Sequence, residues 1–290
     1  MSTTEEISIS ANEGEAAGDP TFVEGVGNIP RDIYKHVQSD PLGDLPRYSM
    51  HIVIQHFLTF ITFLVLAATG LTLHFGDLWW APIVMKLFGG PDIARLIHQG
   101  AAALMILASL YHLSTLIGGT LHKIMKKRFD IKRTQIPMLK DLHDVIHDIK
   151  YFTGREQYRP KMEKFMYKQK LHYLAIIWGT FVLIAAGTSL LFPEVMATIW
   201  PDPKFGQDLA RLMHADEAIM AITVIVFWHW SNVHLVPGRF PLQWSFITGN
   251  ITREHQIEEH FLEYIRNLDE FPEEKEYIKE IIKEKGLDTN

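Results

Sequence analysis

The sequence contains no cysteine among its 290 residues. This absence excludes disulfides, thiolate zinc sites, cysteine-ligated iron–sulfur clusters, covalently attached haem and a cysteine nucleophile. Any metal or redox centre that the chain builds must therefore use histidine or carboxylate ligands. Histidine is abundant, with 15 residues, so the positions of these histidines decide which sites are possible.

Charge is missing from long stretches of the chain. Residues 52–73, 98–121, 171–192 and 215–236 are predominantly apolar, and each covers about 22 residues, close to the length that crosses the hydrocarbon of a bilayer as a helix. Four buried helices of a soluble protein are the alternative, but four spans of this length are unusual in a soluble chain of this size. The mean hydropathy of +0.02 averages these spans with a charged remainder. We therefore predict an all-α fold, an integral-membrane four-helix bundle with cytoplasmic amphipathic helices.

The basic residues predict the orientation. Of 28 lysines and arginines, 14 lie between Lys123 and Lys170, whereas the connections at 76–93 and 193–209 hold only Lys86 and Lys204. Because basic loops stay on the cytoplasmic side, we expect the long loop and both termini in the cytoplasm and the protein in the cytoplasmic (inner) membrane.

Outside the spans, the composition divides the chain further. Residues 1–45 are polar and acidic and predict a disordered arm, residues 46–252 form the membrane domain, and residues 253–290 form a cytoplasmic helical tail. Amphipathic helices are expected within 136–152 and 253–285, the latter with Ile257, Phe261, Tyr264 and Ile265 at helical spacing.

Four histidines occur at matching depths of two spans. His98 and His112 are 14 residues apart, and His214 and His229 are 15 apart. Each pair lies roughly on one stripe of its helix, with a rise of about 21–22 Å between its members. If the stripes face each other, His98 with His214 and His112 with His229 form two stacked sites, each suited to one haem with two axial imidazoles. A polar helix interface explains a single intramembrane histidine about as well, but four at matching depths favour a function.

The second and fourth spans also open alike. Ala94-Arg95-Leu96-Ile97-His98 matches Ala210-Arg211-Leu212-Met213-His214, which indicates two similar helical hairpins. Arg95 and Arg211 lie one turn before the histidines, where they are placed to pair with haem propionates or to anchor the helices at the interface.

With these residues, the chain resembles the membrane di-haem cytochrome b subunits of formate dehydrogenases, nickel–iron hydrogenases and thiosulfate-reductase-like enzymes. The resemblance covers residues 46–265. It rests on Arg47 and His56 followed by Leu66-Ala67-Ala68-Thr69-Gly70, on the two arginine–histidine openings, and on Phe240-Pro241-Leu242 with Thr248-Gly249-Asn250-Ile251.

The resemblance implies a different inner ligand from the one that spacing suggests. In the formate dehydrogenase members the inner haem takes a histidine from the first helix, here His56, in place of His112, so both remain candidates. The family also places a quinone near the inner haem, which implies roles for Gln169 and Lys170, with His234 as a further candidate. Met166 stands where that family has an asparagine in the quinone segment.

The predicted function is electron transfer between a partner oxidoreductase and the quinone pool through two haem b groups, with menaquinone or ubiquinone as the diffusible substrate. Iron–sulfur or multihaem centres would belong to a partner subunit, and membrane lipid, not nucleic acid, surrounds the chain. The alternatives are a histidine-containing membrane anchor or transporter without haem, and a non-haem metal membrane oxidoreductase, although the dense histidine clusters of the latter do not occur.

Overall fold

A computed structural model describes residues 44–236, 239–267 and 272–285. The fold is all-α, as predicted, with one short antiparallel ladder between β1 (Leu45–Pro46) and β2 (Asn250–Ile251). The described residues fall into two compact units: a long-helix unit within 43–138 and 165–252, and a tail unit within 139–164 and 253–290. All but the last two residues of the predicted N-terminal arm lie outside the described residues.

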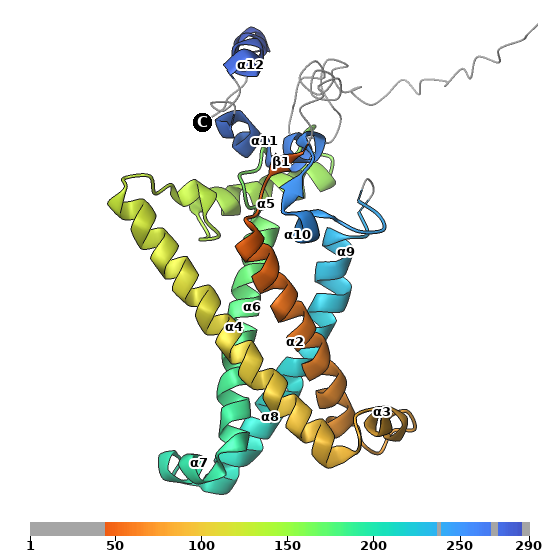
Figure 1. Cartoon of the computed structure of the whole chain (residues 1–290). Helices are drawn as coiled ribbons and strands as arrows, with labels where there is room; N and C mark the ends of the chain where they lie inside the picture. Colours follow the sequence, from red (N-terminus) through yellow and green to blue (C-terminus); the bar gives the residue numbers. More distant parts are fainter. Residues whose placement is uncertain (1–43, 237–238, 268–271, 286–290) are drawn as a thin grey trace, which may run out of the picture. The chain divides into compact units, whose positions relative to one another are not determined.

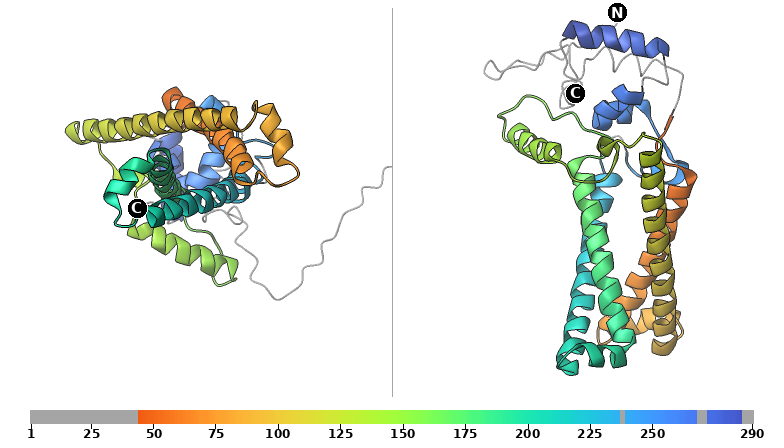
Figure 2. Two further views of the ribbon diagram at one scale, coloured as in Figure 1. Left: turned by 90° about the horizontal axis from the view of Figure 1, so that it is seen from below. Right: turned by 90° about the vertical axis from the view of Figure 1, so that its left-hand side faces the viewer.

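The long-helix unit consists of two helical hairpins (Figure 1). In the first, α2 (Met50–His74) packs against α4 (Pro91–Met125), and in the second, α6 (Tyr167–Leu191) packs against α8 (Pro203–Thr223). The further views in Figure 2 show the same pairing. Each hairpin turns through a short helix, α3 (Ala81–Leu87) or α7 (Pro193–Ile199), and α2 also contacts α8. The expected repeat is therefore present in the order of the helices: a long helix, a short helix and a second long helix occur in each hairpin.

The last long helix changes its winding before it ends. After α8 the backbone continues through a π-helical stretch, η2 (Val224–His229), into α9 (Trp230–Val233), followed by α10 (Ser245–Thr248). The segment that follows returns to the start of α2, where the backbone N–H groups of Arg47 and Tyr48 donate to the Gly249 carbonyl at 2.9 and 2.8 Å.

Three helices, α2, α4 and α6, are long and apolar enough to cross a membrane. Large apolar side chains point outward, with Leu107, Trp178 and Phe181 each more than 60% exposed. Small or polar residues fill the contacts instead. Small interface residues are the usual packing solution where the surrounding solvent is itself apolar. The buried residues include Ala94, Ala101 and Ala108 of α4, Thr62, Thr69 and Thr72 of α2, and Gly179 and Ala186 of α6, together with the larger Val53 and Val182.

The threonines of α2 are compatible with this apolar setting. Their hydroxyls donate to carbonyls one turn earlier, Thr62 to Leu58 at 2.9 Å and Thr69 to Val65 at 2.7 Å. Each buried hydroxyl therefore has an acceptor without water, as a low-dielectric interior requires.

The predicted fourth span, residues 215–236, does not appear as one apolar helix. Its first half belongs to α8, which carries Asp208, Arg211, Asp216 and Glu217, and its second half lies in η2 and α9. Residues 218–236 contain no Asp, Glu, Lys or Arg, so the apolar stretch begins in α8 and passes through the change of winding. The structure thus shows three long apolar helices and one composite helical run, and the four-helix membrane bundle stays a prediction.

The tail unit contains α5 (Leu139–Phe152), α11 (Arg253–Asn267) and α12 (Pro272–Lys285), so both predicted amphipathic segments form helices. On α5 the charged face is buried, and Asp148 accepts a hydrogen bond from the Arg159 guanidinium at 3.0 Å. The apolar face is exposed, with the Leu139 side chain 79% exposed. On α11 the apolar residues Ile257, Phe261 and Tyr264 are buried.

A cysteine-free chain allows a direct test of membrane crossing with single introduced cysteines. Leu87 and Met125, which flank the length of α4, are 81% and 74% exposed. We expect Leu87→Cys to react with a membrane-impermeant maleimide in intact spheroplasts, and Met125→Cys to react only after permeabilisation, because basic residues cluster at the Met125 end. Labelling of permeabilised membranes is the control. Equal labelling of both variants in intact spheroplasts would contradict the crossing.

Candidate functional site

The first candidate site is a pair of histidines, one from each hairpin. His98 on α4 and His214 on α8 lie with their ring centroids 6.2 Å apart, at an interplanar angle of 74°. The sequence predicts this pair, and the structure brings the two rings together.

A glycine lies behind each ring. A Cβ at Gly70 would come within 3.1 Å of His98 Cε1, and a Cβ at Gly187 within 3.0 Å of His214 Cε1. The ring edge that carries Cε1 and Nδ1 therefore faces the glycine in both hairpins. We call the two histidines together with the glycines behind them the glycine-backed pair. Their equivalent contacts show that the two hairpins place their histidines by the same device.

The Nδ1 atoms of the two rings have different surroundings. His98 Nδ1 hydrogen-bonds with Thr69 Oγ1 at 2.9 Å. His214 Nδ1 is buried and has no hydrogen-bond partner among the described residues. A bond at Nδ1 fixes ring orientation, as second-shell partners do for metal-binding histidines, and keeps Nε2 available as a ligand atom.

The helix turns before both histidines are also alike. Asp92 and Arg95 pair at 3.7 Å, and Asp208 and Arg211 pair at 3.3 Å, with both arginines more than 60% exposed. The repeated segment thus reads Asp-x-Ala-Arg-Leu-x-His in both hairpins. Exposed pairs of this kind contribute little stability, so the arginines can exchange their partner for another anion.

The second candidate site is a four-histidine cluster of His56, His172, His229 and His234. The ring of His229 is central, with centroid distances of 6.4 Å to His56, 5.0 Å to His172 and 6.5 Å to His234. Phe246 packs against His56 and His234 at 5.7 and 5.4 Å. On α2, His56 lies 14 residues from Gly70, so this cluster is about 20 Å along the helix from the glycine-backed pair.

The structure places His112 apart from His229. Its Nδ1 hydrogen-bonds with Gln55 Oε1 at 2.9 Å, and its Nε2 hydrogen-bonds with the Tyr173 hydroxyl at 2.8 Å. Both ring nitrogens are therefore engaged by polar side chains from α2 and α6. His229 contacts His56 and His172 in place of His112, the partner that spacing predicts.

The π-helical stretch explains the unequal histidine spacings. His214 and His229 are one residue further apart than His98 and His112, and a π-helical bond spans one residue more than an α-helical bond. The η2 stretch accommodates the additional residue. His229 therefore stays on the same face of the helix as His214, whereas uniform α-helical counting predicts that it is rotated past that face.

His172 is the residue that sequence reasoning missed. Its ring stacks on His229 at an interplanar angle of 16°, and its Nε2 is buried without a hydrogen-bond partner among the described residues. The repeat could have revealed it, because His56 and His172 are separated by 116 residues, the same distance that separates His98 and His214.

The predicted quinone residues lie at the start of α6 and at the end of α9. Gln169 Oε1 accepts a hydrogen bond from the Met166 N–H at 3.1 Å and thereby caps α6, and Lys170 is buried. His234 Nδ1 accepts from the Gln243 N–H at 3.1 Å. Of these residues, His234 belongs to the four-histidine cluster.

Three of these histidine contacts have a separation that suits a single metal between two imidazoles. With metal–nitrogen bonds of about 2 Å to each ring, two axial imidazoles have centroids roughly 6 Å apart. The 6.2 Å of His98 and His214 and the 6.4 Å of His56 and His229 fit this value, and so does the 6.5 Å of His229 and His234. The face-to-face rings of His172 and His229, at 5.0 Å, are too close.

Comparison with known proteins adds no assignment, because neither a protein-family model nor a curated protein matches the chain.

The close contacts of Gly70 and Gly187 with the imidazole rings predict that larger residues at these two positions destabilise the protein. In Gly70→Val and Gly187→Val the new side chain meets the imidazole, and overpacking of this kind costs about 1–3 kcal/mol. Gly118→Val, at an α4 position where a Cβ would meet nothing within 4 Å, carries the same change in helix propensity without the clash. We expect the thermal unfolding midpoints of the purified variants to be lower for the first two. Equal midpoints for all three would show that the glycines are not needed for close approach.

Proposed function

We propose that the chain is a membrane-embedded di-haem b subunit that transfers electrons between a partner oxidoreductase and the quinone pool. The observation that carries this proposal is the repeated 6 Å separation of two imidazoles, at both levels of the helix bundle, in the pairs His98–His214 and His56–His229.

The proposal assigns two histidines to each haem. His98 and His214 would bind the first, supported by the glycines that leave room behind their rings. His56 and His229 would bind the second, because both nitrogens of His112 already have side-chain partners. Spacing alone favours His112, whereas its hydrogen bonds to Gln55 and Tyr173 support the His56 alternative.

A fourth membrane crossing completes the bundle in this proposal. The charge-free stretch 218–236 is close to the length of about 20 residues that a helix needs to span the hydrocarbon. The continuous helical backbone through α8, η2 and α9 satisfies its own N–H and C=O groups, as a bilayer requires. The 14 basic residues between Lys123 and Lys170 favour a cytoplasmic location for that loop and for both termini.

The haem groups would supply reversible one-electron chemistry, and the protein supplies ligands, orientation and burial. Thr69 fixes the His98 ring through its Nδ1 and so directs Nε2 away from the α2 backbone. Arg95 and Arg211 are exposed at the start of their helices and are placed to bind propionate carboxylates. Because two imidazoles would hold each haem, the site would favour electron transfer over binding of oxygen.

The quinone, menaquinone or ubiquinone, would react near the four-histidine cluster. The buried Lys170 and the cluster residues His172 and His234 would be candidates to exchange protons with it, while Gln169 caps the start of α6. Since the chain has no cysteine, any iron–sulfur or covalently bound haem centre would belong to a partner subunit, which would carry electrons to or from it.

Haem counting tests the ligand assignment. We expect two haem b per chain in the purified wild-type protein and one in His98→Ala, His214→Ala, His56→Ala and His229→Ala. His112→Phe serves as the matched control: it removes an intramembrane histidine at the depth of His56, and both haems should remain. The measurement is the pyridine haemochrome spectrum per chain.

Other outcomes would change the assignment. Loss of a haem in His112→Phe with retention in His56→Ala would establish His112 as the inner ligand. A folded wild-type protein without any haem after expression with excess haem supply would overturn the proposal in favour of an anchor or transporter, and bound non-haem iron would favour a metal oxidoreductase.

A further inference from the structure

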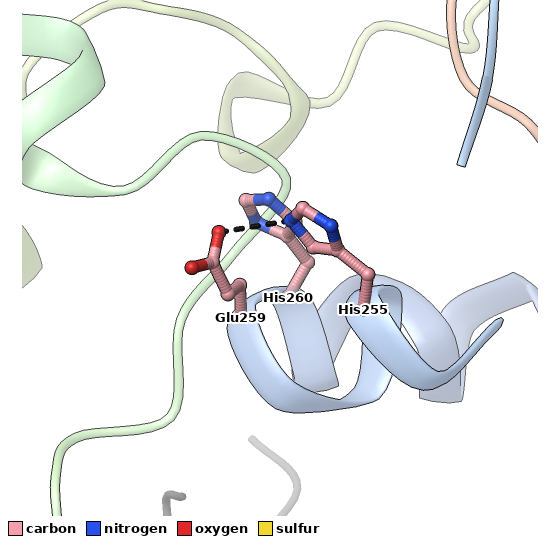
Figure 3. A group of neighbouring side chains, drawn as sticks. All are labelled: His255, Glu259 and His260. Carbon is pink, nitrogen blue, oxygen red and sulfur yellow. Dashed lines mark hydrogen bonds and ion pairs between the residues drawn. The ribbon is translucent and has the colours of Figure 1, made fainter. Parts of the chain in front are cut away.

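The tail unit contains a separate cluster of potential metal ligands. His255, Glu259 and His260 of α11 each direct a ligand atom toward the others, and these atoms all lie within 4.8 Å of one another (Figure 3). His255 Nε2 and Glu259 Oε2 are 3.1 Å apart, and the rings of His255 and His260 are parallel to within 8°.

A break in the helix creates this arrangement. In a regular helix His255 and Glu259, four residues apart, share a face, whereas His260, five residues after His255, points roughly 140° away. The backbone of His260 has φ −137° and ψ 43°, outside the helical region. This kink turns the His260 side chain toward the other two residues, so three ligands converge that sequence spacing alone would not bring together.

His260 is oriented in the way that metal-binding histidines usually are. Its Nδ1 hydrogen-bonds with the Glu163 backbone oxygen at 2.9 Å. Since a carbonyl can only accept, Nδ1 carries the proton and Nε2 keeps its lone pair for a ligand. The residue is 1% exposed.

The cluster lies where α11 is attached to the segment 162–164 of the same unit. The Leu262 N–H donates to the Met162 carbonyl at 3.1 Å, Lys164 pairs with Glu263 at 3.3 Å, and Arg266 forms an ion pair with Glu163. These contacts hold the helix next to the carbonyl that orients His260, so the ligand set is preorganised on a supported element.

We propose that His255, Glu259 and His260 bind a divalent transition-metal ion, with zinc as the best match. Two imidazoles and one carboxylate form a nitrogen–oxygen set that suits zinc and its neighbours and not calcium or magnesium, which prefer oxygen ligands alone. Tetrahedral ligand atoms lie roughly 3.3 Å apart at metal–ligand bonds of about 2 Å, so small side-chain rotations bring the present atoms to bonding distance. Water fills the fourth position. The site is independent of the haem proposal.

Equilibrium dialysis of the full-length protein against zinc, followed by metal analysis, tests the site. We expect the wild type to hold one zinc per chain more than His255→Ala or Glu259→Gln, or to bind that ion at least about tenfold more tightly. These two variants are chosen because His255 and Glu259 are only partly buried, with side chains 14% and 21% exposed, and their substitution spares the buried His260.

The matched controls are Glu258→Gln and His143→Ala. Glu258 is the exposed neighbour of Glu259, and His143 is an exposed histidine of α5, so each control makes the same chemical change outside the cluster. Zinc that binds elsewhere, for example at the four-histidine cluster, is common to all variants and cancels in the comparison. Equal zinc content and affinity in the wild type, both site variants and both controls would overturn the proposal.

Discussion

The close approach of a glycine backbone to an imidazole ring determines how each helical hairpin packs. Gly70 allows α4 to bring His98 against α2, and Gly187 allows α8 to bring His214 against α6. Because a Cβ at either glycine would come within about 3.1 Å of the ring, the helix spacing and the ring position depend on each other. The contact between α2 and α8 then joins the hairpins, and the two rings meet 6.2 Å apart. The rest of the candidate site extends from this layer.

Much of the fold could be predicted because an apolar environment leaves the backbone few choices of secondary structure. A chain surrounded by hydrocarbon must satisfy its backbone groups within helices, so apolar length alone locates α2, α4 and α6. The meeting of His98 and His214 was likewise predictable, since a repeated local sequence produces a repeated position. Local pattern and tertiary position agree there, because the glycine and the histidine of each hairpin recur with nearly the same separation.

The other histidines could not be placed by spacing, because competing partners decide their neighbours. Gln55 and Tyr173 come from other helices and engage both nitrogens of His112, which no periodicity within α4 reveals. The π-helical stretch before Trp230 changes the phase of His229, and uniform α-helical counting does not include it. The kink at His260 has the same consequence in α11. In each case a local departure from the regular helix brings side chains together.

The two levels of the bundle have kept the repeat to different degrees, and this difference bears on their roles. The glycine-backed pair is duplicated in its histidines, its glycines and its preceding aspartate–arginine pairs. At the other level, His56 and His172 keep the repeat separation of 116 residues, whereas Trp228 stands at that separation from His112. A site that only relays electrons has no reason to treat the hairpins differently, while a site that also takes up a substrate on one side does. Under the proposed function, the asymmetric level is therefore the one that we assign to quinone chemistry.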